Sequence, residues 1–278
     1  MRLIIESGAT KADWCLLDGG IAAKRFKTSG MNFSTMSEEG ICEIVKSALP
    51  MLGSAEVDEI FLYAAGLIDG SPAYNDTVAA FAKVFQGAVF EGASDMLAAA
   101  RAVCGRSEGI AAILGTGSNS CFYDGVRILR NVRSGGFILG DEGGGACLGK
   151  LFLADYIKGI VPEPLASEFG SAFKVDYMTV VENVYRKPAP SAYLGSFAPW
   201  ILEHSADAYV NRLLRRNISD FFDRSLLQYG RRDVPVGFVG GFAAACESVL
   251  RDIAGEKGIA VSRIMSSPME GLISYHSL

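Results

Sequence analysis

A short loop of glycine and hydroxyl residues occurs twice in the chain. Its first copy, Ser-Gly-Ala-Thr-Lys at residues 7–11, follows the apolar run 3–5, and its second copy, Gly-Thr-Gly-Ser-Asn at residues 115–119, follows the apolar run 110–114. Each copy leads into a strand-like segment and then an Asp-Gly turn, at Asp18 and at Asp124. A tight turn of small residues lets backbone N–H groups approach an anion closely. The repeat therefore predicts two hairpins that hold one polyphosphate between them.

Three carboxylates stand where the predicted secondary structure changes. Glu6 ends the first apolar strand, Asp95 precedes an Ala-rich stretch, and Asp141 lies in the string Gly-Asp-Glu-Gly. A carboxylate at a strand end can bind Mg²⁺ or its water shell, and a short acid between glycines can bind two vicinal sugar hydroxyls. Taken alone, Asp95 is typical of an acid that complements the dipole of a helix in its first turn. Glu91 is a second acid close to it in the sequence.

Two further loops have residues that suit a ligand. Asn32, in the loop 30–34, can donate and accept hydrogen bonds, which suits sugar hydroxyls, although an ordinary turn residue is an equal alternative. Gly240-Gly241-Phe242 follows an apolar strand and opens a helix, so a flat base can lie against its backbone amides. On its own, a Gly-Gly turn of this kind is more often structural.

One string resembles a P-loop and is rejected. Residues 144–150, Gly-Gly-Ala-Cys-Leu-Gly-Lys, fit the pattern Gly-x4-Gly-Lys, but Leu151 follows, so the Ser or Thr hydroxyl that binds Mg²⁺ is missing. His204 and His276 are isolated in the sequence, and we expect both to be packed or surface residues.

The hydrophobic pattern predicts the same order of elements in both halves of the chain. In the first half we expect strands over 2–6, 12–18 and 21–27, a helix over 37–52 capped by Ser37, a strand over 60–63, a helix over 75–86, a strand over 88–90, and a helix from 95 to about 103 capped by Ser94. In the second half we expect strands over 110–114, 119–123 and 127–132, a helical insertion from about 146 to 230 with its clearest helix over 205–229, a strand over 236–239, a helix over 242–254 and a strand over 259–261. This internal duplication predicts two lobes around a cleft, residues 1–106 and 107–278, with the last helix, 268–278, packing back on the N-terminal lobe.

The composition excludes several classes of protein. A chain of 278 residues that is 50% hydrophobic can build a sizeable core, and a net charge of −5 without a long basic run argues against nucleic acid or anionic membrane as partners. The six cysteines form no Cys-x-x-Cys pair, which favours reduced thiols in a cytoplasmic protein over a disulfide or zinc framework. The run 3–5 is too short for a signal peptide, and no stretch approaches the ~18 apolar residues of a spanning helix.

Together, the two hairpins, Gly-Asp-Glu-Gly-Gly at 140–144 and Val-Gly-Gly-Phe at 239–242 resemble the sugar kinase/Hsp70/actin superfamily. Within it, the chain resembles the N-acetylglucosamine kinase branch of the BadF/BadG/BcrA/BcrD ATPase family along nearly its whole length. The resemblance implies an α/β fold of duplicated ribonuclease H-like lobes, the actin-like ATPase fold. It also implies a cytoplasmic, homodimeric enzyme that uses ATP and Mg²⁺ to phosphorylate the 6-hydroxyl of an amino sugar, first of all N-acetylglucosamine.

The resemblance assigns roles to residues of this chain. The phosphates would be bound by Gly8, Ala9, Thr10 and Lys11 and by Gly115, Thr116, Gly117 and Ser118, with Gly240, Gly241 and Phe242 near the adenine. The sugar would contact Asn32, Asn119 and Asp141; Asp95 would be the catalytic base, and Glu6 would hold Mg²⁺. The family usually has Asp where this chain has Glu6, and Gly-Gly where it has Ser7-Gly8.

Three alternatives remain open at this point. The substrate can be N-acetylmuramate or glucosamine instead. An ATPase activator of a radical-type dehydratase would hold an iron–sulfur cluster with cysteines at a dimer interface, whereas the cysteines here are scattered. The third alternative is a sugar-sensing pseudokinase without turnover, and the one feature of the sequence that points to it is Glu6 in place of the family's Asp.

Overall fold

A computed structural model describes residues 1–8, 11–33 and 36–277, so Ala9 and Thr10 of the first hairpin lie outside the described residues. The chain forms two compact units. Unit 1 comprises Met1–Glu108, Tyr123–Ile128 and Ser267–Leu278, and unit 2 comprises Gly109–Phe122 and Leu129–Ser266. No helix among the described residues is long and apolar enough to cross a membrane.

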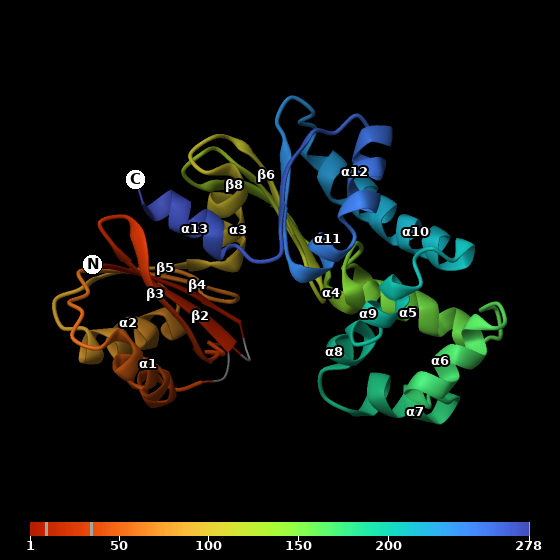
Figure 1. The fold of residues 1–278 in the computed structure, drawn as a ribbon, viewed down its shortest axis with the longest axis horizontal. Coiled ribbons are helices and arrows are strands. Elements are labelled where there is room, and N and C mark those ends of the chain that lie inside the picture. Colours follow the sequence, from red (N-terminus) through yellow and green to blue (C-terminus); the bar gives the residue numbers. More distant parts are fainter. Residues whose placement is uncertain (9–10, 34–35, 278) are drawn as a thin grey trace. The chain divides into compact units, whose positions relative to one another are not determined.

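Unit 1 is built on a five-stranded sheet in the order β3-β2-β1-β4-β5 (Figure 1). Its strands are β1 (Arg2–Ser7), β2 (Lys11–Asp18), β3 (Ile21–Ser29), β4 (Glu59–Ala64) and β5 (Val89–Ser94). The first three strands form an antiparallel meander, and β4 and β5 continue the sheet from β1 in parallel. The carboxyl ends of β1, β4 and β5 therefore meet at one edge of the sheet.

Helices cover both faces of this sheet, and the alternation along β1 decides which side chain meets which helices. Leu3 and Ile5 share a core with α1 (Glu38–Leu52) and α2 (Pro72–Val84), whereas Ile4 shares one with α3 (Asp95–Cys104) and α13 (Met269–His276). Because successive side chains of a strand point to opposite faces, Glu6 follows Ile4 to the α3 face and Ser7 follows Ile5 to the α1 face.

Unit 2 repeats the strand order of unit 1. Its sheet runs β10-β9-β6-β7-β8, with β6 in the place of β1, and β6 pairs in parallel with β9, which pairs in parallel with β10. The strands are β6 (Gly109–Leu114), β7 (Ser118–Tyr123), β8 (Ile128–Val132), β9 (Val236–Val239) and β10 (Val261–Met265). The predicted duplication is therefore present in the structure.

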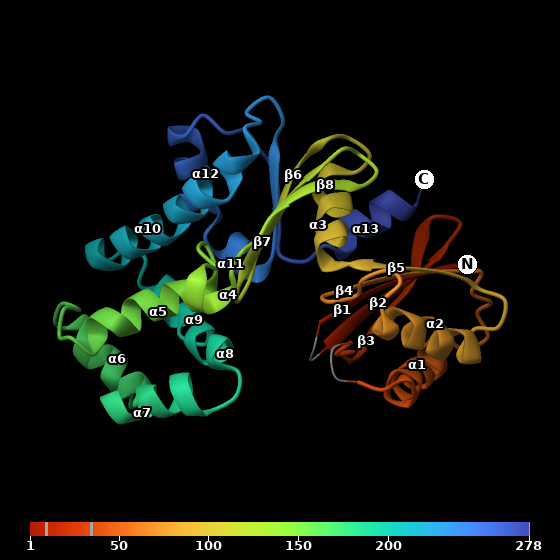
Figure 2. The same ribbon diagram turned by 180° about the vertical axis from the view of Figure 1, so that it is seen from behind.

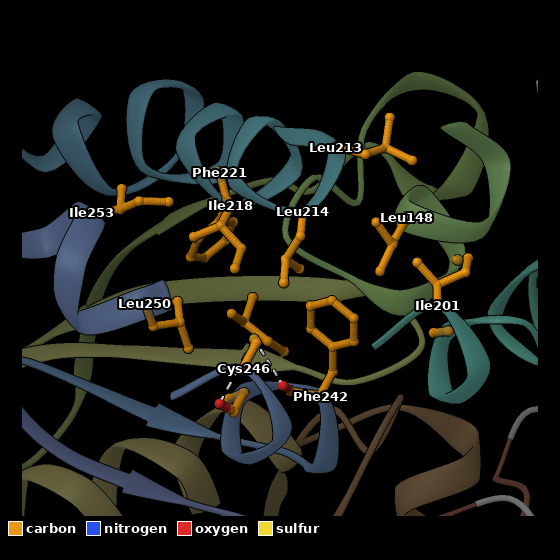
Figure 3. Close-up of a cluster of buried hydrophobic side chains, with 14 of the residues drawn as sticks. Leu148, Ile201, Leu213, Leu214, Ile218, Phe221, Phe242, Cys246, Leu250 and Ile253 are labelled. Atoms are coloured by element: carbon orange, nitrogen blue, oxygen red, sulfur yellow. Dashed lines mark hydrogen bonds between the residues drawn. The ribbon is translucent and has the colours of Figure 1, made fainter. Parts of the chain in front are cut away.

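Helices fill the chain between β8 and β9 and flank β10. They are α4 (Gly136–Leu139), α5 (Gly145–Tyr156), α6 (Leu165–Phe173), α7 (Tyr177–Val181), the π-turn η1 (Glu182–Arg186), α8 (Pro190–Gly195), α9 (Ala198–Glu203), α10 (Ala208–Arg224), the 3₁₀ turn η2 (Leu226–Tyr229), α11 (Gly241–Ala245) and α12 (Glu247–Glu256). Figure 2 shows the same elements from behind. Figure 3 shows side chains of α10 directed toward Phe242, Cys246 and Leu250, and these residues belong to the core of unit 2.

Several predicted boundaries are wrong for local reasons. The helix predicted over 205–229 begins at Ala208, because Asp207 caps the amides of Tyr209 and Val210, and it ends at Arg224 before the turn η2. The helix predicted to begin at residue 75 begins at Pro72, after the cap Ser71. The strand predicted over 259–261 is β10, Val261–Met265.

The helix predicted over 242–254 is broken at Cys246 into α11 and α12. The backbone there leaves the helical region, with φ −115° and ψ 27°, and the Cys246 thiol lies 2.9 Å from the Phe242 carbonyl oxygen (Figure 3). The break lets both Phe242 and Leu250 reach the core of unit 2.

Candidate active site

Asp95 and Glu6 lie at the carboxyl edge of the parallel strands of unit 1. Glu6 pairs in register with Tyr63 of β4, and Ala64, the next residue, pairs with Ser94 at the end of β5. Ser94 caps α3 as predicted, since its Oγ accepts from the Leu97 amide at 3.2 Å. Asp95 is the first residue of that helix, and its Oδ1 accepts from the Met96 amide at 2.9 Å. Burial raises the pKa of the Asp95 carboxyl above its ordinary value.

Glu6 lies in a negative field. Burial raises the pKa of Glu6, the charges of Asp13 and Asp95 raise it further, and Lys11 opposes them. Asp13 is the partner of Glu6 across β1 and β2, and it forms an ion pair with Lys27 at 3.3 Å. Asp13 was not predicted as a site residue; the antiparallel register of the hairpin is the signal that places it beside Glu6.

The carboxylates around Glu6 fit a Mg²⁺ ion whose remaining ligands are phosphate oxygens and water. Among the described residues, no three His, Cys, Asp or Glu side chains are close enough to hold a metal ion by themselves. Mg²⁺ in nucleotide sites is usually held by one or two carboxylates together with phosphate oxygens and water. Glu6 can supply such a carboxylate, and a bound cation would relieve the repulsion that raises its pKa.

Glu91, the competitor of Asp95, has a structural partner instead. Its Oε1 lies 2.6 Å from Nη1 of Arg101, a guanidinium whose side chain is only 12% exposed. Among the described residues, Asp95 forms no ion pair of this kind. This difference favours Asp95 as the acid available to a substrate.

A buried hydroxyl ties the first hairpin to the loop that carries Asn32. The Gly8 amide donates to the Lys11 carbonyl at 3.0 Å and closes the turn. The Ser7 hydroxyl donates to the Gly8 carbonyl at 3.2 Å and accepts from the Met31 amide at 2.9 Å. Sequence reasoning noted Ser7 as a departure from the family but did not assign it a role.

The second glycine-rich hairpin, at residues 115–119 in unit 2, is held by hydrogen bonds to the start of α5. The carbonyls of Gly115 and Thr116 accept from the amides of Gly145 and Ala146, both at 2.8 Å. The Gly115 amide donates to the Gly117 carbonyl at 3.0 Å within the turn. The hairpin is therefore a rigid loop rather than a free one.

Asp141, in the loop between α4 and α5, packs against this second hairpin. It is buried, adopts a positive φ of 57°, and its Oδ1 accepts from the Ser118 amide at 3.3 Å. A side chain on Gly117 would meet Asp141 Oδ2 at 2.9 Å, which explains the glycine. The structure thus brings together three predicted residues that the sequence separates into two loops.

The buried side chain of Asn217 holds the loop that follows Asp141. Its Oδ1 accepts from the Gly143 amide at 3.0 Å, and its Nδ2 donates to the Gly144 carbonyl at 3.1 Å. Asn217 was missed by sequence reasoning, although an asparagine on the apolar face of α10 is a usable signal, because buried amides are almost always bonded.

The other two predicted sugar contacts lie on separate elements. Asn32 belongs to the loop after β3 in unit 1, where its carbonyl accepts from the Met36 amide at 2.9 Å. Asn119 lies on β7 in unit 2, and its Oδ1 accepts from Nδ2 of Asn131 at 2.8 Å.

A pocket of about 220 Å³ in unit 2 joins the second hairpin to the turn after β9. It is lined by Gly115, Thr116, Gly145, Gly195, Ala198, Pro199, Leu202, Gly241, Phe242 and Ala245. Small and apolar groups of this kind leave room for a flat, uncharged ring. Gly240 is not among them: a Cβ there would lie 2.2 Å from the Leu114 carbonyl oxygen, so this glycine allows β9 to approach β6.

The remaining motifs are structural. Lys150, the lysine of the rejected P-loop string, donates to the Phe137 carbonyl at 2.7 Å. His204 bonds to Glu168 and to the Trp200 carbonyl, and the His276 ring bonds to Tyr63. All six cysteines are free, and all but Cys104 are buried.

Comparison with known proteins identifies the fold and the family of this chain. No protein-family model and no curated protein matches the chain. Among solved structures, the proposed N-acetylglucosamine kinase of Porphyromonas gingivalis is 40% identical, with a TM-score of 0.92 over 100% of this chain and 99% of that one. The proposed N-acetylglucosamine kinase of Chromobacterium violaceum is 19% identical, with a TM-score of 0.76 over 99% and 98% of the two chains. The ROK hexokinase of Thermus thermophilus is 16% identical, with a TM-score of 0.53 over 99% and 96%.

These structural similarities first establish the class of protein. The chain has the actin-like ATPase fold of the sugar kinases, with duplicated ribonuclease H-like lobes, which confirms the predicted fold class. The 40% identity over the full chain then shows the family: this protein belongs with the Porphyromonas gingivalis protein in the N-acetylglucosamine kinase-like family.

Proposed function

We propose that this protein is an ATP-dependent sugar kinase that transfers the γ-phosphoryl group to the 6-hydroxyl of an amino sugar, N-acetylglucosamine first. The observation that carries the proposal is the Asp95 carboxyl. It begins a helix directly after a parallel strand, its pKa is raised, and Glu6 lies at the same sheet edge. The 40% identity to a proposed N-acetylglucosamine kinase supports the choice of sugar.

Asp95 would act as the general base. It would accept the proton of the sugar hydroxyl as that hydroxyl attacks the γ-phosphorus. A carboxylate whose pKa is raised by burial is a better proton acceptor than an ordinary aspartate. The Met96 amide holds Oδ1 and so limits rotation of the carboxylate.

Glu6 would hold Mg²⁺, and the ion would neutralise charge on the phosphates when it is bound. The first hairpin would present the Lys11 ammonium to the same phosphates, and Ser7 would keep that hairpin in register with the Asn32 loop. Asn32, with an amide that donates and accepts, would bind sugar hydroxyls.

Unit 2 would supply the nucleotide site. The apolar pocket beside Gly241 and Phe242 would take the adenine ring, and the adjoining hairpin at Gly115–Ser118 would bind phosphate oxygens. Asp141 and Asn119 would contact the sugar from this unit. The Asp141 carboxylate, on a backbone with a positive φ, would accept hydrogen bonds from two vicinal hydroxyls.

A panel of sugars with ATP and Mg²⁺, read as ADP release, tests the proposal. N-acetylglucosamine should give the highest kcat/KM, with N-acetylmuramate and glucosamine as the comparison arms. The 6-deoxy analogue of N-acetylglucosamine should bind and give no phosphorylated product. ADP release that does not depend on any sugar would indicate an ATPase, and sugar binding without turnover would indicate a sensor; either result would overturn the proposal.

A further inference from the structure

A buried chain of hydrogen bonds joins β4, α3 and α13 within unit 1. Arg101 Nη1 lies 2.6 Å from the Tyr63 hydroxyl, which lies 2.7 Å from Nε2 of His276. Arginine can only donate, so the Tyr63 oxygen accepts from Arg101. Burial and the charges of Arg101, Arg2 and Arg106 lower the pKa of His276 to about 3, so its ring is neutral where it shares a hydrogen bond with the Tyr63 hydroxyl.

The Arg101 guanidinium is fixed from other directions as well. It forms an ion pair with Glu91 at 2.6 Å, and it lies over the ring of Tyr275 with its central carbon 5.0 Å from the ring centroid. Tyr275 and His276 both belong to α13. Helix α13 therefore contacts the Arg101 guanidinium directly through the ring face of Tyr275, and it is connected to the same group indirectly, because His276 bonds to the Tyr63 hydroxyl. Directional contacts of this kind restrict rotation as well as separation.

Helix α13 also packs so closely against α3 that a side chain on Gly271 would clash with Ala102. A Cβ on Gly271 would lie 2.4 Å from the Ala102 carbonyl oxygen and 2.5 Å from its Cα. The alanines of α3, at 98, 99, 100 and 102, are buried. With small residues on both sides, α3 is held between the sheet and α13 with little freedom to shift.

The same contacts set the position of the proposed catalytic acids. Asp95 and Arg101 lie on the one helix α3, and Tyr63 pairs in register with Glu6. We propose that Arg101 and Tyr63 are positioning residues for phosphoryl transfer, which hold α3 against α13 and thereby fix the backbone from which Asp95 projects. This inference rests on the proposed function.

A purely stabilising role does not require this arrangement. Burying a guanidinium is costly, and apolar residues of similar volume often stabilise a fold as well or better. The cluster of Ile4, Leu17, Met269 and Leu272 already joins α13 to the sheet by apolar contacts. What the hydrogen bonds add is a defined orientation, which matters because a catalytic group displaced by about 1 Å can lose about a hundredfold in rate.

Two variants test the proposal at different contacts. Tyr63→Phe keeps the ring and removes the hydroxyl, and Gly271→Ala forces α13 away from Ala102. Tyr209→Phe is the matched control, because it removes a hydroxyl that bonds to Asp155 at 2.8 Å in unit 2. For each protein we would measure kcat, both KM values, the melting temperature, the active fraction from sugar-binding stoichiometry, and hydrogen exchange of the Met96 and Leu97 amides.

We expect Tyr63→Phe to lower kcat per active site by about tenfold or more while both KM values stay within about twofold. The Met96 and Leu97 amides, which bond to Asp95 and Ser94, should exchange about tenfold faster. Gly271→Ala should act in the same direction, and Tyr209→Phe should change neither kcat nor these amides.

The positioning role is overturned if Tyr63→Phe lowers the melting temperature but keeps the wild-type kcat and the wild-type exchange at Met96 and Leu97. If Gly271→Ala does not fold, Tyr63→Phe alone decides. A wild-type protein that phosphorylates no sugar would refute the proposed function. Hydrogen exchange would still show whether the Tyr63 hydroxyl orders the start of α3, and unchanged exchange would refute that as well.

Discussion

The Ser7 hydroxyl accepts a hydrogen bond from the Met31 amide at 2.9 Å, and this contact links the first hairpin to the loop that carries Asn32. Ser7 is only 3% exposed, so water cannot replace the bond. If this hairpin binds phosphate and this loop binds the sugar, as proposed, both should respond when the buried bond between them is lost.

Ser7→Ala should therefore raise the sugar KM by several-fold and destabilise the protein by about 1–3 kcal/mol, the usual range for a buried donor left without a partner. Ser47→Ala is the control, because Ser47 is exposed and its hydroxyl donates to the Ile44 carbonyl within its own helix. Steady-state kinetics and urea unfolding would measure both effects. An unchanged sugar KM in a destabilised variant would mean that Ser7 does not help to place the Asn32 loop.

Asp95→Asn should lower kcat by about a hundredfold or more and leave sugar and ATP binding nearly unchanged, as expected for loss of a general base. Glu91→Gln, which can still accept from Arg101, should lose no more than a few-fold. Because the base must be ionised, the rate of the wild type should fall as the pH drops through the raised pKa of Asp95. A wild-type kcat in Asp95→Asn would remove this residue from the mechanism.

Metal binding by Glu6 can be tested by measuring the stability of the protein as well as its rate. Its pKa is raised in the folded state, so its contribution to stability is present below the ordinary value of 4.5 and is lost as the pH rises through the raised value. At pH 7 without metal, Glu6→Gln should therefore melt at a higher temperature than the wild type. Mg²⁺ should stabilise the wild type more than Glu6→Gln, because the cation relieves the repulsion from Asp13 and Asp95.

Activity across a Mg²⁺ titration completes this test. Glu6→Gln should lose most of its activity, and Glu6→Asp should keep or improve it, since the shorter acid suits the octahedral geometry of Mg²⁺. Equal rates and equal Mg²⁺ dependence in the wild type and Glu6→Gln would refute a metal role for Glu6.

Gly117→Ala and Asp141→Ala should have similar effects, although their chemistry differs. A methyl group at position 117 would lie 2.9 Å from Asp141 Oδ2, so the carboxylate must move. Both variants should raise the sugar KM by about tenfold or more, since each removes or displaces the carboxylate that is proposed to accept hydrogen bonds from sugar hydroxyls. Gly255→Ala is the control outside the proposed site, because Gly255 is exposed on α12 and a side chain there meets nothing within 4 Å. If only the ATP KM rises, Asp141 acts through the hairpin and does not contact the sugar.

The two histidines should contribute to the pH dependence of stability with opposite sign. The pKa of His276 is lowered to about 3, so its contribution is present above the ordinary value of 6.5 and is lost as the pH falls toward 3, by up to about 1.4 kcal/mol per pH unit. Hydrogen bonds to the Trp200 carbonyl and Glu168 raise the pKa of the half-buried His204, whose contribution is lost as the pH rises.

Urea unfolding between pH 4 and 6.5 would measure these slopes. His276→Gln should reduce the loss of stability on acidification, whereas His204→Gln should slightly increase it. A slope in His276→Gln equal to that of the wild type would mean that His276 is protonated in the folded protein.

Much of the fold follows from local patterns. Ser37 and Ser94 cap their helices as predicted, because a serine hydroxyl bonds to a nearby free amide whatever the rest of the chain does. The order of elements along the chain and its repetition in the second half were predicted from two matching runs of strands and helices, whereas the order of strands within each sheet comes from the structure. The break at Cys246 could not be predicted, because the sequence around it keeps a helical period and the core decides where α11 must end.

The sequence by itself determined which residues are of the right type and lie at or next to the ends of strands and helices: Glu6, Asp95, Asp141 and the two glycine-rich hairpins. Only the tertiary structure decided which of them have partners. Ser118 and Asp141 are 23 residues apart and Tyr63 and His276 are 213 apart, yet each pair is joined by a hydrogen bond. Such pairs depend on how closely whole elements pack, as at Gly271 and Gly117, and the period of a sequence carries no information about that distance.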